Sequence, residues 1–217
     1  MVNATSRQAA TALLRENVSL DFINPVVADS DSDYFFSSYE HLIDWGVAVG
    51  SVSQTQADEL HSLAARATAA TQRVFDYARH IRATLDGALR SAANAQSLKP
   101  HVADLNAVMS TALAHRRLSV RGNQLAWDWP FETNLGSVFW PVIPAAIDLL
   151  MSAELAHLKI CGGCGWLFLD SSKNHSRKWC RMSDCGNVAK VRSHRERGRA
   201  AYVSKDRDRF SHRGIER

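Results

Sequence analysis

The chain has 217 residues, of which 46% are hydrophobic and 22% charged. This composition excludes wholesale disorder, a collagen helix and a coiled-coil rod. The net charge of +4 is unevenly distributed along the chain. Residues 1–158 hold 11 basic and 16 acidic side chains, a net of −5. Residues 159–217 hold 15 basic and 6 acidic side chains, a net of +9, and all four cysteines. We therefore expect two domains, 1–158 and 159–217.

The sequence indicates neither a membrane span nor a signal peptide. The longest apolar run, residues 138–147, is far shorter than the roughly 20 residues that a helix needs to cross a bilayer. The N-terminal residues lack the continuous apolar segment of a signal peptide. We expect a cytoplasmic protein with reduced thiols, in which clustered cysteines indicate metal ligands or redox groups ahead of disulfides.

The elements predicted in the first region are mostly helices. Two Ser-x-x-Glu/Gln spacings, Ser37 with Glu40 and Ser53 with Gln56, are typical of capping boxes at helix starts. Apolar residues at helical spacing then predict a long amphipathic helix. Its stripe is Val74, Tyr77, Ala78, Ile81, Leu85 and Leu89.

Three further elements follow a break at residues 98–100. Apolar spacing predicts a helix over residues 102–113. Alternating apolar residues on both sides of Gly122-Asn123 predict a β-hairpin. Residues 137–159 are predicted to form a buried helix, with Pro141 and Pro144 in its first turns, where proline is tolerated.

The cysteines have the spacing of a structural metal site, with two, fifteen and four residues between successive ligands: Cys161, Cys164, Cys180 and Cys185. Gly165 and Gly186 follow the two pairs and allow the positive φ that such turns require. Four thiolates complete a tetrahedral Zn²⁺ shell and leave no position for water, which favours a structural ion over a catalytic one. Trp166, Phe168 and Trp179 are predicted to form an apolar cap over the site.

Several alternatives remain open for these cysteines. They are a redox pair, although no βαβ unit surrounds it, an iron–sulfur cluster, although the spacing matches neither ferredoxin pattern, and two disulfides. His175 and His194 are possible substitute ligands.

A basic helix is predicted over residues 188–205, directly after the last cysteine. Arg192, Arg195 and Arg199 share one face at i, i+3 and i+7 spacing. Guanidinium groups pair with phosphates and with guanine edges, so this face predicts contact with nucleic acid, with DNA ahead of RNA. The alternative is a solvated charged face. Further cations of the candidate surface are Arg177, Lys178, Arg181 and Lys190.

Residues 161–190 closely resemble the CGNR-type zinc finger of bacterial transcription regulators. One departure is visible, because Val188 stands where that family has the arginine of its name. The matching positions beyond the first cysteine pair are Phe168, Asp170, Ser172, Arg177, Lys178, Trp179, Cys180, Met182, Cys185, Gly186, Asn187 and Lys190.

The first region resembles the ABATE domain, a module of stress-induced transcription regulators that accompanies this finger. The resemblance rests on the sequence LDFIN at residues 20–24, on Asp44-Trp45 and on Arg79-x-x-Arg82, with Pro25 where the family usually has threonine. The two resemblances together imply a two-domain regulator. They imply a mainly α fold: a multihelical body with a β-hairpin, then a small treble-clef or ribbon-like zinc finger ending in a basic helix.

The body is expected to sense a ligand or to form a homodimer. Asp21, Asn24, Arg79 and Arg82 are candidates to bind a small anion, although internal pairing of the arginines with Asp21 or Asp44 is the alternative. An aromatic cluster is expected to form core, pocket wall or dimer interface: Trp127, Trp129, Phe131, Phe139 and Trp140.

No enzyme is predicted, since the sequence contains no glycine-rich phosphate loop, nucleophile elbow or His-Glu-x-x-His motif. The alternatives to a DNA-binding regulator are a zinc-stabilised protein-interaction module and a thiol redox sensor.

Overall fold

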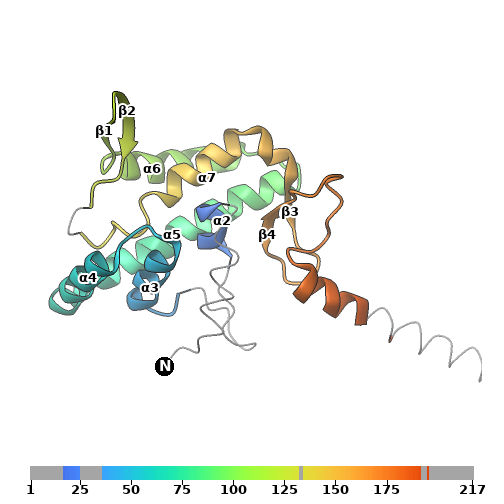
Figure 1. The fold of residues 1–217 in the computed structure, drawn as a ribbon, viewed down its shortest axis with the longest axis horizontal. Helices are drawn as coiled ribbons and strands as arrows, with labels where there is room; N and C mark the ends of the chain where they lie inside the picture. Colours follow the sequence, from blue (N-terminus) through green and yellow to red (C-terminus); the bar gives the residue numbers. More distant parts are fainter. Residues whose placement is uncertain (1–16, 25–35, 132–133, 192–194, 196–217) are drawn as a thin grey trace, which may run out of the picture.

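The computed structural model describes residues 17–24, 36–131, 134–191 and 195. Figure 1 shows a helical body with a small β-hairpin at each end. The expected mainly α fold with a small cysteine-bearing finger is confirmed. The helices of the body are α2 (Val18–Ile23), α3 (Tyr39–Val49), α4 (Gln54–Arg66), α5 (Thr68–Ala93), α6 (Val102–Leu113) and α7 (Val142–Met151), with a 3-10 turn at Lys99–His101.

Helix α5 is the central element of the body. Its 26 residues bury an apolar stripe that includes Ile81, Leu85 and Leu89, which confirms the predicted long amphipathic helix. The helix contacts α2, α3, α4, α6 and α7, so one helix organises the whole core (Figure 1). The helices of the described ranges are all too short or too polar to cross a membrane.

The helix starts were predicted with mixed success. The capping box at Ser53 is confirmed: Ser53 N–H donates to Gln56 Oε1 at 2.7 Å, and Gln56 N–H donates to Ser53 Oγ at 3.3 Å. The box at Ser37 is wrong by one residue, because Ser38 is the N-cap and its Oγ accepts from His41 N–H. Two adjacent serines offer the same chemistry, and spacing alone does not choose between them.

The hairpin around Gly122 is confirmed. Strand β1 (Arg117–Arg121) pairs antiparallel with β2 (Gln124–Asp128), and Gly122 has a φ of +65° in the turn. The hairpin projects from the body, at the top of Figure 1. The register places four exposed apolar side chains on one face of the hairpin: Leu118, Val120, Leu125 and Trp127.

The helix predicted over residues 137–159 is confirmed only for its middle part: residues 137–141 form turns, and the residues after Met151 leave the α-helix. Helix α7 follows Pro141 and ends at Met151, and a 3-10 helix, η2 (Ala153–His157), comes next. Residues Leu158–Ile160 then form strand β3, which pairs antiparallel with β4 (Leu167–Leu169). Helical periodicity could not reveal this change, because the partner of β3 lies seven residues further along the chain.

The β3–β4 hairpin has two faces that belong to different cores. Leu158, Leu167 and Leu169 lie in the main core of the body. On the opposite face Phe168 packs with Cys161 and with the other cysteine-bearing segment. The expected boundary between residues 158 and 159 therefore falls inside strand β3, which contributes to both regions, and the division into domains 1–158 and 159–217 stays a prediction.

Candidate metal centre and nucleic-acid interface

The structure brings all four cysteines together. Their Sγ atoms lie within 4.8 Å of one another. The Sγ of Cys180 is 3.6 Å from that of Cys164 and 3.8 Å from that of Cys185. A tetrahedral ion with Zn–S bonds of about 2.3 Å separates its sulfurs by about 3.8 Å, so the cluster has the size of a zinc shell. These separations exceed the roughly 2.05 Å of a disulfide bond, and the four thiols are free in this structure.

The first cysteine pair lies in a tight turn between β3 and β4. Cys161 N–H donates to Trp166 O at 2.7 Å, and Gly165 N–H donates to Cys161 O at 2.9 Å, which closes the turn. Gly165 has the predicted positive φ, at +76°. At Gly163 a Cβ would lie 3.0 Å from the Cβ of Cys185, so the glycine lets the second pair approach.

The second cysteine pair is held by a π-helical turn, η3 (Met182–Gly186): Cys180 precedes the turn and Cys185 lies within it. Gly186 N–H donates to Arg181 O at 3.0 Å. The prediction that Gly186 needs a positive φ is wrong, since the positive-φ glycines of the described residues do not include it. Glycine is needed at this position for another reason, because a Cβ there would lie only 2.7 Å from Met182 Sδ.

The electrostatics of the cluster favour a bound cation. Burial opposes ionisation of Cys161, but N–H donors, among them those of Cys180 and Gly163, lower its pKa to about 6. Burial and the neighbouring thiols raise the pKa of Cys185 to about 12, and that of Cys180 rises for the same reasons. The chain thus stabilises the Cys161 thiolate, whereas ionisation of Cys180 and Cys185 is favoured by a positive ion between the sulfurs. Four sulfur donors suit Zn²⁺.

The predicted apolar cap surrounds the cluster. Phe168 is buried beside Cys161 and Cys180, and Trp166 and Trp179 pack against them half-buried. The possible substitute ligand His175 points elsewhere: its Nδ1 bonds to Asp170 O at 2.7 Å, and its ring stacks on His157 at 3.6 Å. His194 lies outside the described residues.

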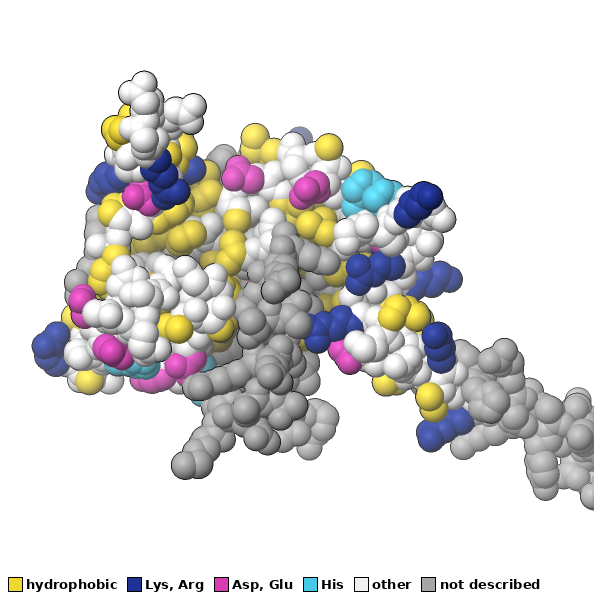
Figure 2. All heavy atoms as spheres, in the orientation of Figure 1, with side chains coloured by type: hydrophobic (Ala, Val, Ile, Leu, Met, Phe, Trp, Pro, Cys, Tyr) yellow, Lys and Arg dark blue, Asp and Glu magenta, His cyan; other side chains and the backbone are white. Residues whose placement is uncertain are grey.

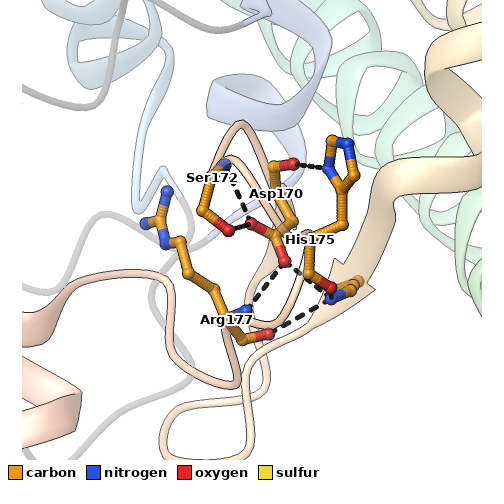
Figure 3. A network of polar contacts seen from close by, with 5 residues as sticks. Asp170, Ser172, His175 and Arg177 are labelled. Atoms are coloured by element: carbon orange, nitrogen blue, oxygen red, sulfur yellow. Dashed lines mark hydrogen bonds and ion pairs between the residues drawn. The ribbon is translucent and has the colours of Figure 1, made fainter.

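A buried carboxylate holds together the loop between the two cysteine pairs (Figure 3). Asp170 is 0% exposed and accepts from Lys159 Nζ at 2.6 Å and from Arg177 N–H at 2.8 Å. Ser172 donates to it through N–H at 3.1 Å and Oγ at 2.6 Å. Burial alone would raise the pKa of Asp170, but these donors outweigh burial and hold it well below its usual range. The family motif marked Asp170 and Ser172, whereas nothing in the sequence singled out Lys159.

The predicted nucleic-acid surface is partly engaged in the fold. Arg177 is half-buried: its guanidinium donates to Cys180 O and lies 5.3 Å from the Phe168 ring centre. Arg177 therefore braces the finger. Arg181 lies 3.5 Å from Asp184.

Other members of that surface face solvent. Lys178, Lys190 and Arg195 are exposed, and Figure 2 shows Lys and Arg side chains gathered over the finger at the right of the view. Residues 187–191 and 195 are helical, which agrees with the start of the predicted basic helix. Arg192 and Arg199 lie outside the described residues.

The four residues predicted to bind an anion each interact with other groups of the chain. The Asn24 amide bonds to both backbone groups of Leu167, and Arg82 Nε donates to Ile23 O at 2.9 Å. Arg79 is 4.0 Å from Asp76 on the same exposed helix face. Asp21 also interacts within the chain. An anion site at these residues stays a prediction.

The helical body joined to a small finger with four clustered cysteines defines a class of protein, a helical domain followed by a finger with a candidate metal site. Residues 157–198 match the family described as "CGNR zinc finger". Residues 16–153, more than half of the chain, match the ABATE family, described as "Putative stress-induced transcription regulator". The chain belongs to the ABATE family. No curated protein matches it.

Proposed function

We propose that this chain is a zinc-containing, non-catalytic transcription regulator of the cytoplasm, whose finger binds DNA and whose body senses a small ligand or dimerises. The observation that carries the proposal is the cluster of four thiols within 4.8 Å in a finger of the CGNR family. The membership of the body in a regulator family supports it.

The cysteines would hold the metal: Cys161, Cys164, Cys180 and Cys185. Bound there, Zn²⁺ supplies a fixed tetrahedral centre that stabilises the finger and has no open position for substrate. We expect metal analysis of the purified protein to give one zinc per chain. The variant Cys180→Ser is expected to lose its zinc during purification. A chain with iron, or with no metal after purification and zinc supplementation, would contradict the proposal.

The exposed cations of the finger support DNA as the partner. Neutralised phosphates release counterions, so binding to mixed-sequence duplex DNA should weaken steeply with salt. We expect the double variant Lys190→Ala/Arg195→Ala to flatten the slope of log K against log salt by about 0.9 for each phosphate that the variant no longer neutralises. The control Arg121→Ala removes an exposed guanidinium from the body hairpin and should leave the slope unchanged. No binding at low salt would favour the protein-interaction module.

A redox sensor is the second candidate, because Cys164 is exposed beside three other thiols. Mild peroxide would then release zinc, and a thiol reductant with fresh zinc would restore it. Zinc retention under peroxide that oxidises a free-thiol control would reject this candidate.

Dimerisation has a candidate surface in the exposed apolar face of β1–β2. Exposed apolar patches on soluble proteins often mark interaction sites. Sedimentation should show a dimer that Leu125→Glu, at a 71% exposed position, converts to a monomer. A wild-type monomer at micromolar concentration would remove the dimer from the proposal.

A further inference from the structure

The sequence LDFIN ends in a side chain that reaches into the metal finger. Asn24 lies at the end of α2 in the body, and its amide bonds to the backbone of Leu167 in β4. We infer that Asn24 and Arg90 are positioning residues of the metal site, so that metal binding by the finger and the structure of the body are coupled. The inference rests on the proposed zinc site.

The Asn24 side chain makes the two hydrogen bonds to β4 that a neighbouring strand would otherwise make. Its Nδ2 donates to Leu167 O at 2.8 Å, and Leu167 N–H donates to its Oδ1 at 2.9 Å. Asn24 is only 7% exposed, so the loss of its amide leaves two buried backbone groups unpaired. Leu167 also pairs with Ile160, the residue before Cys161. Asn24 therefore fixes the strand ends from which the first cysteine pair is held.

Asn24 is itself held firmly by the body. Its N–H donates to Leu20 O at 2.9 Å, and the preceding residues Phe22 and Ile23 are fully buried. Arg82 on α5 donates through Nε to Ile23 O at 2.9 Å. The end of α2 is thus anchored to the central helix, and a displacement of α2 would move the amide that holds β4.

A second link joins α5 to the cysteine turn. Arg90 Nη1 donates to Gly165 O at 2.9 Å, while its Nε lies 2.9 Å from both carboxylate oxygens of Asp86. Gly165 directly follows Cys164, and its N–H closes the turn onto Cys161 O. The ion pair with Asp86 aims the Arg90 guanidinium at the turn, so two elements of the body fix the first cysteine pair from two sides.

Coupling follows from these links by thermodynamic linkage. A metal ion needs its ligands near a fixed geometry, and a preformed turn lowers the ordering cost of binding. If the body raises metal affinity through Asn24 and Arg90, the metal must stabilise α2 and the end of α5 by the same factor. A body that shifts α2 on binding a ligand would then change how firmly the finger is held.

The test uses the full chain and Co²⁺, whose thiolate charge-transfer and d–d absorption reports on the ligand shell, with Zn²⁺ as competitor. We expect Asn24→Ala to weaken Co²⁺ binding by about 10–100-fold, the usual effect of removing a partner that orients metal ligands. We expect Arg90→Gln to weaken it less, with altered d–d bands in both variants. Asn106→Ala, at an exposed position on α6, is the matched control and should bind as the wild type does.

A second measurement covers the case in which Asn24→Ala fails to fold. Hydrogen exchange on the wild-type chain should show slower exchange in Val18–Ile23 when Zn²⁺ is added, and Arg90→Gln should reduce this protection at the end of α5. Wild-type Co²⁺ affinity and bands in folded Asn24→Ala and Arg90→Gln would overturn the inference. Unchanged exchange in α2 on metal binding would overturn it as well. A wild-type chain that binds neither ion would instead overturn the proposed metal function.

Discussion

Val188 occupies the position at which the CGNR family has arginine, and the structure leaves its side chain 69% exposed on the last described helix. Lys190, two residues further on, is exposed as well. An arginine at position 188 would add one cation to this exposed surface without crowding the core. We expect Val188→Arg to strengthen binding to duplex DNA at low salt and to steepen the salt slope by about 0.9. Val188→Gln is the control for size and polarity, and an equal gain with glutamine would refute the electrostatic explanation.

Asp170 carries a prediction about pH. Its pKa lies below the ordinary value of 3.8 in the folded chain, so the carboxylate contributes stability above about pH 4 and loses it as the pH falls further. Asp170→Asn should therefore lower the free energy of unfolding at pH 7, and the difference from the wild type should shrink below pH 4. Urea titrations over a pH series, with a chelator in every sample so that metal release does not contribute, measure this difference. A difference that stays constant with pH would show that the charge of Asp170 is not the cause.

The roles of residues that depend on local sequence spacing were predictable. The roles of residues whose partners lie far away in the sequence were not. The cysteine spacing predicted a cluster that the structure confirms, because the ligand spacing of a zinc site is local. The role of Asn24 was missed, since its partner Leu167 is 143 residues away. The same is true of Arg90, whose partner Gly165 is 75 residues away.

The β3–β4 hairpin is the element whose role differs most from the prediction. It belongs by sequence to the finger, yet Leu167 is 1% exposed within the core of the body. We expect Leu167→Ala to lower the free energy of unfolding of the whole chain by about 2–5 kcal/mol, measured by urea unfolding with helical circular dichroism as signal. Met151→Ala, at an 80% exposed position at the end of α7, is the control, with an expected change within about 0.5 kcal/mol. Equal effects would show that the hairpin does not belong to the core.

Elements specified by local sequence were more predictable in this chain than elements that depend on a distant partner. The stripe of α5 and the hairpin around Gly122 follow from local periodicity and turn chemistry, and both are confirmed. The end of α7 at Met151 was not predicted. Neither was the strand at residues 158–160, because these residues take their conformation from pairing with strand β4. Short apolar segments fit a helix and a strand equally well until a partner is known.

The molecule as a whole should unfold as one unit with its metal. At zinc concentrations about 1,000 times the dissociation constant, binding adds about 4 kcal/mol to the free energy of unfolding. For a chain of this size that corresponds to a rise in Tm of roughly 10 °C. We expect calorimetry to show one transition that moves down by about this amount on chelation. Two transitions, of which only one responds to chelation, would show independent domains.

The shared hairpin limits how such regulators can be taken apart. A finger excised after α7 would carry Leu158, Leu167 and Leu169 into water, and the remaining body would keep an open apolar surface where they packed. Grafting this finger onto another protein would require the end of α2 and the last turns of α5 to travel with it. A change of the proposed DNA specificity is therefore expected to succeed by substitutions at exposed positions such as Val188 and Lys190, and to fail by transfer of the finger alone.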